Sequence, residues 1–252
     1  MPAALSAARA LTILAAGAIL SAAAQATVTI TAESTVPAVM LEQGRVTGHA
    51  AEKVHEIMRR AGLPYTMALM PWKRALTLAR TQNDTCVFMT TRTPERESWF
   101  HWIGPISQAD WVLFGRAGRP FQIRTLADAR GLRIGAYNGD VRGEFLKAQG
   151  LNVEFAQSDD SNPKKLMLER LDLWVNSTRS SRAVLARTGL TGQVVPVHTF
   201  RQEKLYLACN AAMAPADIAP MHAALRAMET DGSYKAIEQR FEHLQTAPLP
   251  TP

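Results

Sequence analysis

Short apolar or β-branched segments alternate with segments of helical periodicity along most of this sequence. One helical segment, AAEKVHEIMRRAG, places Val54, Ile57 and Met58 on one face and ends at Gly62, a residue type that commonly terminates helices. Strands that alternate with helices at this spacing predict βαβ units and mainly parallel sheets. The predicted strands cover residues 28–32, 65–70, 86–89, 132–137, 152–156, 171–176, 194–200 and 205–209, and two further helices are expected over 215–230 and 234–244.

The first 26 residues have the composition of a secretory signal peptide. A lone Arg9 precedes an uncharged run rich in Ala, Leu and Ile, and Ala24-Gln25-Ala26 is typical of a cleavage site. The apolar run over 10–24 is shorter than the roughly 20 residues that span a bilayer. We therefore expect removal of residues 1–26 and export of a soluble protein to the periplasm.

Length and charge narrow the class of protein. Removing 26 of the 252 residues leaves 226, and the loss of Arg9 lowers the formal net charge from +6 to +5. This length is sufficient for two lobes of about 100 residues each. The sequence has no run of five or more Lys/Arg residues and no mixed aromatic and basic motif, so we expect no nucleic-acid partner.

The histidines and cysteines give little indication of chemistry. The sequence contains no H-E-x-x-H, C-x-x-C or G-x-S-x-G motif and no phosphate-binding glycine loop, so we expect no catalytic residue, no metal and no cofactor. Two cysteines, Cys86 and Cys209, could form a disulfide in an oxidising compartment. Two buried free thiols are the alternative, because cysteine packs as a small hydrophobe.

The segment TTRTPERE places two arginines at an expected helix start. Thr93 has the chemistry of an N-cap, and Pro94 suits the first helical position. Arg96 then lies just inside the helix and Arg92 just outside it. A cation there opposes the helix dipole at a cost of up to about 1 kcal/mol, so these arginines call for another explanation.

Several segments together supply that explanation. In order they are PWKRALTLAR, NDTCVFMTTRTPERESWFHWIGPI, TLADARGLRIGAYNG, LERLDLWVNS, EKLYLACN and METDGSYKAIEQRFEHL. This series resembles bacterial extracellular solute-binding proteins of family 3, the polar amino-acid type. The resemblance covers nearly all of the chain after residue 26, and RTPERE with the following W-x-G-P is its most specific part.

The resemblance implies an α/β, two-lobed type II periplasmic-binding-protein fold with two hinge strands. Lobe 1 would comprise 27–106 and 206–246, lobe 2 would comprise 110–200, and 247–252 would be a flexible tail. The hinge strands would lie near 104–110 and 200–204. Such a protein closes around a small-molecule ligand by hinge bending. It would act as a monomer and deliver its ligand to an inner-membrane ABC permease.

The same resemblance implies a site. Arg96 occupies the position that binds a ligand carboxylate in relatives, which suits a bidentate guanidinium at a helix start. The alternative for Arg96 is a surface salt bridge with Glu97 or Glu52, and Arg92 is expected to brace the loop. The full set of expected ligand-binding residues is Glu33, Trp72, Thr91, Arg96, Asn138, Gly139, Asn176 and Ser177, with backbone N–H groups of Asn138-Gly139 facing the anionic end of the ligand.

Two departures from the family pattern affect the ligand. Asn176-Ser177 stands where amino-acid-binding relatives have an acidic residue for the ligand ammonium. Because an unpaired buried ammonium is costly, either Glu33 substitutes or the ligand is not a standard zwitterion. The usual aromatic wall after the first strand is also missing, and Trp72 is either its replacement or a core residue. Arg74, Arg142 and Arg179 could face the cleft, although basic side chains on helices are usually solvated.

The resemblance also leaves other functions open. A periplasmic dehydratase of the cyclohexadienyl type shares this fold, and Glu33 could serve as its general acid. A ligand-sensing module for a membrane partner is a second alternative. The implied topology makes 86–89 and 205–209 antiparallel neighbours, which would bring Cys86 and Cys209 together as a disulfide.

Overall fold

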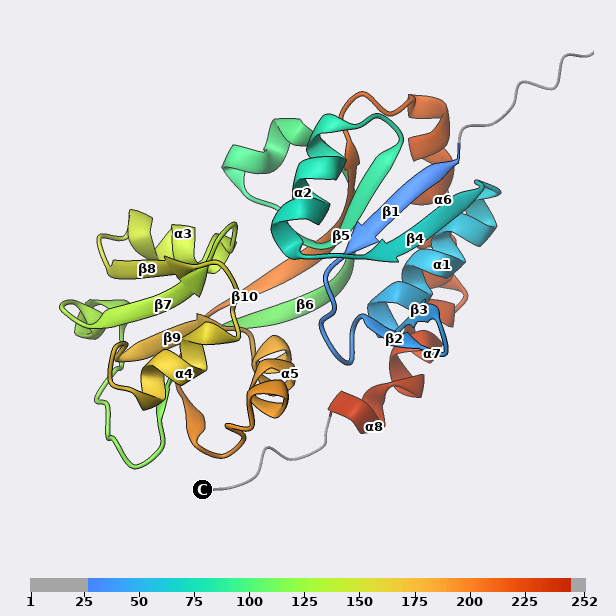
Figure 1. Cartoon of the computed structure of the whole chain (residues 1–252). Helices are drawn as coiled ribbons and strands as arrows, with labels where there is room; N and C mark the ends of the chain where they lie inside the picture. Colours follow the sequence, from blue (N-terminus) through green and yellow to red (C-terminus); the bar gives the residue numbers. More distant parts are fainter. Residues whose placement is uncertain (1–26, 246–252) are drawn as a thin grey trace, which may run out of the picture.

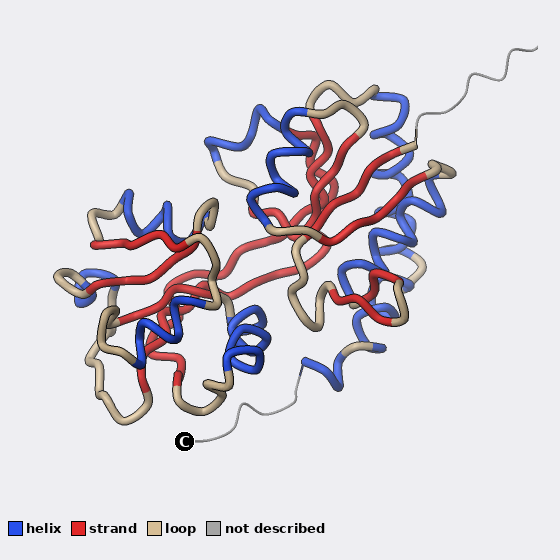
Figure 2. The backbone as a smooth tube through the Cα atoms, in the orientation of Figure 1, coloured by secondary structure: helices blue, strands red, loops and turns tan. Residues whose placement is uncertain are grey.

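The computed structural model describes residues 27–245 and has two lobes connected by two long strands (Figure 1). The expected signal peptide and the tail at 247–252 lie outside these residues. Eight strands form one continuous sheet in the order β4-β1-β5-β10-β6-β9-β7-β8. The two long strands, β6 and β10, occupy the middle of this order and pass from one lobe to the other (Figure 2). The fold is therefore the expected α/β, two-lobed type II architecture.

The first lobe is built on three parallel strands. Strand β1 pairs in parallel with both β4 and β5, and β10 pairs with β5 in antiparallel register. Its elements are β1 (Val28–Ala32), the hairpin β2 (Met40–Glu42) and β3 (Arg45–Thr47), α1 (His49–Ala61), β4 (Tyr65–Leu69), α2 (Trp72–Thr81), β5 (Thr85–Thr91), the 3-10 helix η1 (Pro94–Trp99), α6 (Pro215–Thr230), α7 (Ser233–Arg240) and α8 (Glu242–Gln245). The C-terminal helices thus return to the lobe that contains the start of the chain.

The second lobe repeats the plan with β7 in the middle of three parallel strands. This strand pairs in parallel with β8 and β9, and β9 joins β6 in antiparallel register. The elements are the 3-10 helix η2 (Leu126–Ala129), β7 (Arg133–Tyr137), α3 (Val141–Ala148), β8 (Asn152–Ala156), α4 (Ser161–Met167), β9 (Leu173–Asn176) and α5 (Thr178–Thr188). Each lobe has its own buried apolar core.

The connecting strands are longer than the sequence patterns predicted. β6 (Phe100–Arg116) and β10 (Val194–Asn210) each have 17 residues and run antiparallel along most of their length. The expected strands at 194–200 and 205–209 are therefore one element. The segments expected as hinges are paired directly across these two strands, as in the register Asp110 to Gln202.

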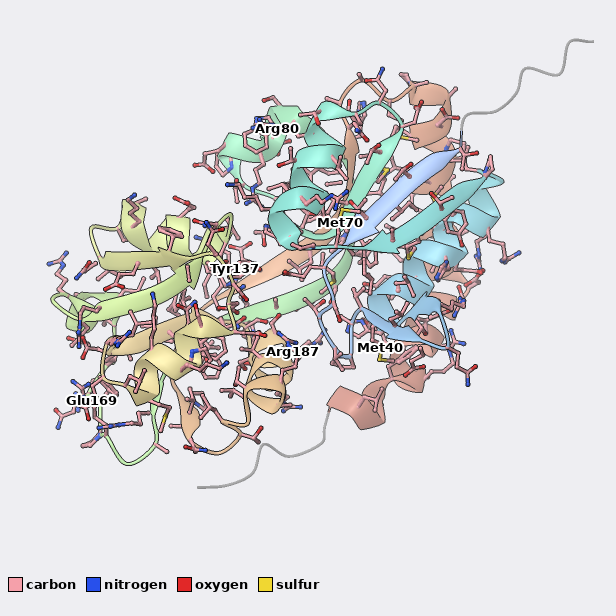
Figure 3. All side chains as sticks on the ribbon, in the orientation of Figure 1. Met40, Met70, Arg80, Tyr137, Glu169 and Arg187 are labelled. Atoms are coloured by element: carbon pink, nitrogen blue, oxygen red, sulfur yellow. A yellow bond between two sulfur atoms is a disulfide. The ribbon has the colours of Figure 1, made fainter. Side chains whose placement is uncertain are left out.

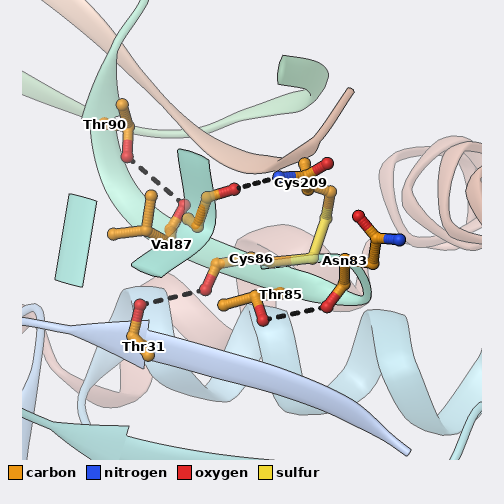
Figure 4. Close-up of a disulfide and its surroundings, with 9 residues drawn as sticks. Thr31, Asn83, Thr85, Cys86, Val87, Thr90 and Cys209 are labelled. Atoms are coloured by element: carbon orange, nitrogen blue, oxygen red, sulfur yellow. Dashed lines mark hydrogen bonds between the residues drawn. A yellow bond between two sulfur atoms is a disulfide. The ribbon is translucent and has the colours of Figure 1, made fainter. Parts of the chain in front are cut away.

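A disulfide between Cys86 and Cys209 joins strands β5 and β10 (Figure 4). Cys86 and Cys209 are register partners in the antiparallel pair, with their α-carbons 3.9 Å and their sulfurs 2.06 Å apart. Both residues are fully buried. The structure thus contains the expected bridge rather than two free thiols.

The α-helix expected after Thr93 does not form. The structure forms a six-residue 3-10 helix, Pro94–Trp99, and the Thr93 side chain does not cap it. Strand β6 begins at the next residue, which leaves no length for an α-helix. The electrostatic cost that an α-helix dipole would impose on Arg96 therefore does not arise here.

Candidate ligand-binding cleft

The candidate site lies between the lobes, where loops follow the carboxyl ends of parallel strands. This is the usual location of ligand sites in open α/β sheets. A cavity of about 890 Å³ is lined by residues of both lobes, among them Met70 and Tyr137. Figure 3 shows these two side chains on the facing ends of the two lobes. A smaller cavity of about 80 Å³ shares Glu33, Trp72 and Tyr137 with it.

The structure brings the expected ligand-binding residues to these interlobe cavities. Glu33, Trp72, Asn138 and Asn176 line the larger cavity, while Glu33, Trp72, Thr91, Arg96 and Ser177 line the smaller one. Gly139 lies close by and lines a third cavity of about 820 Å³ on another side of the interlobe contact. The expected residues therefore lie together between the lobes, as one ligand site requires. Their contacts with a ligand stay predictions.

Arg96 is buried, and no acidic residue within 27–245 forms an ion pair with it. Its side chain comes from η1, and the residue is 8% exposed. Nη2 donates to the carbonyl oxygen of Gly139 at 3.4 Å, whereas Nη1 has no hydrogen-bond partner among the described residues. Burial lowers the pKa of Arg96, against an opposing effect of Asp140. The guanidinium is therefore a buried cation with an unused donor, an arrangement that favours an anion.

The salt-bridge alternative for Arg96 is wrong, because both proposed acids have other partners. Glu97 accepts from Nε of Arg92 at 2.8 Å. Glu52 pairs with Arg45. The first pair is exposed and ties the two ends of the Thr93 loop together, which agrees with a bracing role for Arg92.

Glu33 connects the two lobes. It follows β1, and its Oε1 accepts from the backbone N–H of Trp72 at 3.3 Å. Its Oε2 accepts from the hydroxyl of Tyr137 in lobe 2 at 3.0 Å. Burial raises the pKa of Glu33, while these two hydrogen bonds lower it. Both carboxylate oxygens are already engaged inside the protein.

Trp72 serves as a wall of the cleft and as a core residue. Its indole N–H donates to the carbonyl oxygen of Gly139 at 3.0 Å, across the lobes. The residue is 9% exposed and packs in a cluster with Ala75 and Phe100. The two roles weighed from the sequence are thus compatible.

The turn at Asn138-Gly139 presents a different group from the one expected. The amide of Asn138 donates to Ala156 and that of Asp140 donates to Tyr137, each at 3.0 Å. Toward lobe 1 the turn offers the carbonyl oxygen of Gly139, which accepts from Trp72 and Arg96. The expectation of a free N–H group is therefore wrong for Asn138, whose donor pairs with the end of β8, and it stays a prediction for Gly139.

Asn176 and Ser177 are engaged within lobe 2. Asn176 is fully buried; its Oδ1 accepts from Nη1 of Arg142 at 2.9 Å, and its Nδ2 donates to Asp159 at 2.8 Å. Ser177 caps α5, with its Oγ accepting from the amide of Ser180 at 3.0 Å. An acid at position 176 would face Asp159 directly, which explains why an amide suits this position.

Sequence reasoning missed several polar residues of the cleft. Asp140 caps α3 and pairs with Arg142 at 2.8 Å, and the side chains of Asp140 and Arg142 are 2% and 11% exposed. Of the two possibilities left open for Arg142, the structure has the one at the cleft, where Arg142 lines both interlobe cavities. Asp159, which follows β8, accepts from the indole N–H of Trp174 at 2.7 Å, and burial raises its pKa to about 7. The position of Asp140 and Asp159 directly after strands is the signal that could have identified them.

A third interlobe contact lies nearer the connecting strands. Nη1 of Arg179, in lobe 2, lies 2.9 Å from Nε2 of His49, in lobe 1. Burial, reinforced by Arg179 and Lys53, lowers the pKa of His49 to about 3. His49 is therefore neutral at pH 7 and accepts this hydrogen bond. Within residues 27–245, no group of three or more His, Cys, Asp or Glu residues is placed to hold a metal.

Comparison with known families identifies the chain. The model of bacterial extracellular solute-binding proteins, family 3, matches residues 28–243. The chain belongs to this family. Comparison with curated proteins gives no match.

Solved structures share the fold of this family 3 protein at low sequence identity. A histidine kinase sensor domain with similarity to periplasmic binding proteins has a TM-score of 0.76 at 17% identity, covering 86% of this chain and 96% of that one. A mutant of ArgBP from T. maritima has a TM-score of 0.71 at 19% identity, with coverage of 87% and 95%. The arginine-, lysine-, histidine-binding protein ArtJ from Geobacillus stearothermophilus has a TM-score of 0.71 at 15% identity, with coverage of 88% and 100%. In the described part of our chain, none of the helices is both long and apolar enough to cross a membrane.

Proposed function

We propose that this protein is a periplasmic solute-binding protein that captures a small carboxylate-bearing ligand, an amino acid or a related compound, between its lobes. The observation that carries the proposal is the buried guanidinium of Arg96, whose Nη1 has no partner among residues 27–245. A carboxylate in the cleft would neutralise this cation and accept the unused hydrogen bond. Thr91, at the end of β5, lines the same small cavity and can add a hydroxyl donor.

Delivery to an inner-membrane ABC permease is the role we propose for the captured ligand. The solved structures with this fold include the amino-acid-binding proteins ArgBP and ArtJ, which supports a transport role. They also include a histidine kinase sensor domain, so handing the ligand state to a membrane sensor is the second candidate. Glu33, the general acid that a dehydratase would need, has both oxygens bonded to Trp72 and Tyr137, which favours binding over catalysis.

Thermal-shift screening of residues 27–252 against amino acids, organic acids and amines tests the proposal. A ligand that binds only the folded state raises the melting temperature. We expect a carboxylate-bearing hit, and we expect Arg96→Ala to bind it more weakly by about 1.5 to 3 kcal/mol, the range for loss of a charge-assisted hydrogen bond.

Arg92→Ala is the matched control, because Arg92 lies in the same segment but pairs with Glu97. It should keep the affinity of the native protein. Arg96→Ala should fold normally, since it removes a buried charge that has no acidic partner. Unchanged affinity in Arg96→Ala would contradict the proposed site.

A further inference from the structure

Asp140 has a feature that the proposed carboxylate site does not use. Its residue exposure is 3%, and its Oδ2 has no hydrogen-bond partner within the described chain. The other oxygen, Oδ1, accepts from the backbone N–H of Arg142 at 3.0 Å and from its Nε at 2.8 Å. One oxygen of this buried carboxylate is thus hydrogen-bonded to Arg142 of α3, and the other has no hydrogen-bond partner among the described residues.

The unused oxygen of Asp140 and the unused donor of Arg96 belong to residues of the same cavity. Both residues line the cavity of about 80 Å³. They are close enough for Asp140 to raise the pKa of Arg96 against the lowering by burial, yet no ion pair within 4.0 Å joins them among the described residues. A buried donor and a buried acceptor of opposite charge, both unsatisfied, fit a ligand that carries both charges.

We propose that Asp140 binds the cationic nitrogen of the ligand, and that the ligand is therefore a zwitterion with its carboxylate at Arg96 and its ammonium at Asp140. This assignment rests on the proposed function, since it takes the Arg96 site as given. Amino-acid-binding relatives hold the ligand ammonium with an acidic residue at the position of Asn176, at the end of β9. In this chain we assign that role to Asp140, the N-cap of α3.

The other acids of the cleft are less suited to this role. Both oxygens of Glu33 accept hydrogen bonds from Trp72 and Tyr137. Both oxygens of Asp159 are also occupied, Oδ1 by Trp174 and Oδ2 by Asn176. At either residue an ammonium would have to share an oxygen that already accepts an internal hydrogen bond, whereas Oδ2 of Asp140 accepts none within the described residues.

The shape of the cleft separates the head group from the rest of the ligand. The small cavity admits only a compact group at Arg96 and Asp140. Glu33, Trp72 and Tyr137 line both cavities, so a ligand side chain can continue past them into the space of about 890 Å³. This arrangement fits a 2-amino acid whose side chain extends toward Asp159 and Arg187.

The test compares the standard L-amino acids with the 2-hydroxy acids that carry the same side chains. Thermal shift finds the binders, and titration calorimetry measures each pair against native protein and Asp140→Asn. Asparagine caps helices as well as aspartate, so α3 should persist. We also use Asp140→Ser, another good N-cap, as a second variant that keeps the test valid if Asp140→Asn unfolds.

The control is Asp172→Asn, which removes an acid of lobe 2 that pairs with Arg119 and Arg133 and lines none of the three cavities described above. We expect native protein and control to prefer an amino acid over its hydroxy acid by at least about tenfold, and both Asp140 variants to lose that preference.

The outcomes separate the two proposals. A preference that survives both Asp140 substitutions, or a hydroxy acid that binds native protein as tightly as the amino acid, would overturn the role of Asp140 and leave the carboxylate site standing. Failure of both series, and of every other carboxylate in the thermal-shift screen, to bind native protein would overturn both.

Discussion

At the residue scale, the cleft is defined by polar atoms that the fold buries and leaves unused. Leaving a buried polar group without a partner costs about 1 to 3 kcal/mol, and more when the group is charged. Most buried groups near the cleft avoid this cost: Asn176, for example, bonds Arg142, Ser177 and Asp159. Thr35, which lines both interlobe cavities, also has a hydroxyl without a hydrogen-bond partner among the described residues, but Arg96 and Asp140 are more informative because their side chains carry a charge.

Only part of this residue-level arrangement could be predicted from the sequence. The RTPERE segment identified Arg96, because its motif is local. The partners of Arg96 and Glu33 could not be predicted, since the Gly139 carbonyl and the Tyr137 hydroxyl come from the other lobe, more than 40 and 100 residues away. The hydrogen bond from the Asn138 amide to Ala156 could not be predicted either, because it depends on how β8 packs beside this turn.

His49 gives a residue-scale prediction for the pH dependence of stability. Its pKa falls from 6.5 to about 3 on folding, so the unfolded state binds one more proton between these values. Stability is therefore lost as the pH falls from 6.5 toward 3, at about 1.4 kcal/mol per pH unit for this group. His49→Gln should show a shallower acid slope by that amount.

Urea denaturation at pH 7, 6, 5 and 4 measures the slope for both proteins. His55→Gln is a control on the same helix, because His55 is only partly buried and bonds Tyr65 within lobe 1. Equal slopes for the native protein and His49→Gln would show that another group governs the acid response.

At the scale of elements, regular βαβ units could be predicted and the connecting strands could not. β1 is a short apolar and β-branched run, and β4, β7 and β8 are short runs that lie between helices, so their patterns identify them. β6 begins with aromatics, contains Pro105 and continues through the polar Ser107, so no single periodicity marks it. Its length follows from pairing with β10, a long-range contact that no local pattern contains.

The disulfide gives the prediction at this scale. It closes a loop with a sequence separation of 123 residues, for which the chain-entropy model gives about 4 to 5 kcal/mol of stabilisation. The double substitution Cys86→Ala and Cys209→Ala should lower the free energy of unfolding by up to that amount. Ligand affinity should change little, because Cys86 lies at the opposite end of β5 from Thr91.

Urea denaturation of the oxidised, reduced and doubly substituted proteins measures this contribution. Calorimetric titration with the screened ligand reports on the cleft. A substituted protein as stable as the oxidised one would contradict the structural role, and a lost affinity would show that the bridge also shapes the cleft.

At the scale of the whole molecule, the lobes contact each other through a few hydrogen bonds around the cleft. The hydrogen bonds that cross from one lobe to the other include Trp72 to Gly139, Arg96 to Gly139, Tyr137 to Glu33 and Arg179 to His49. The covalent connection consists of the long β6 and β10 pair (Figure 1). Opening by hinge bending would break these contacts while the paired strands stay intact. A ligand that bonds Arg96 from lobe 1 and Asp140 from lobe 2 would favour the closed arrangement.

The central claim is that a ligand carboxylate binds Arg96 between the lobes. Calorimetric titration of native protein with the screened ligand and with its carboxamide, which has the same shape but no negative charge, tests this claim most directly. We predict that the carboxamide binds at least about tenfold more weakly to native protein. For Arg96→Ala, we predict that acid and amide bind about equally. A carboxamide that binds native protein as tightly as the acid would contradict the claim.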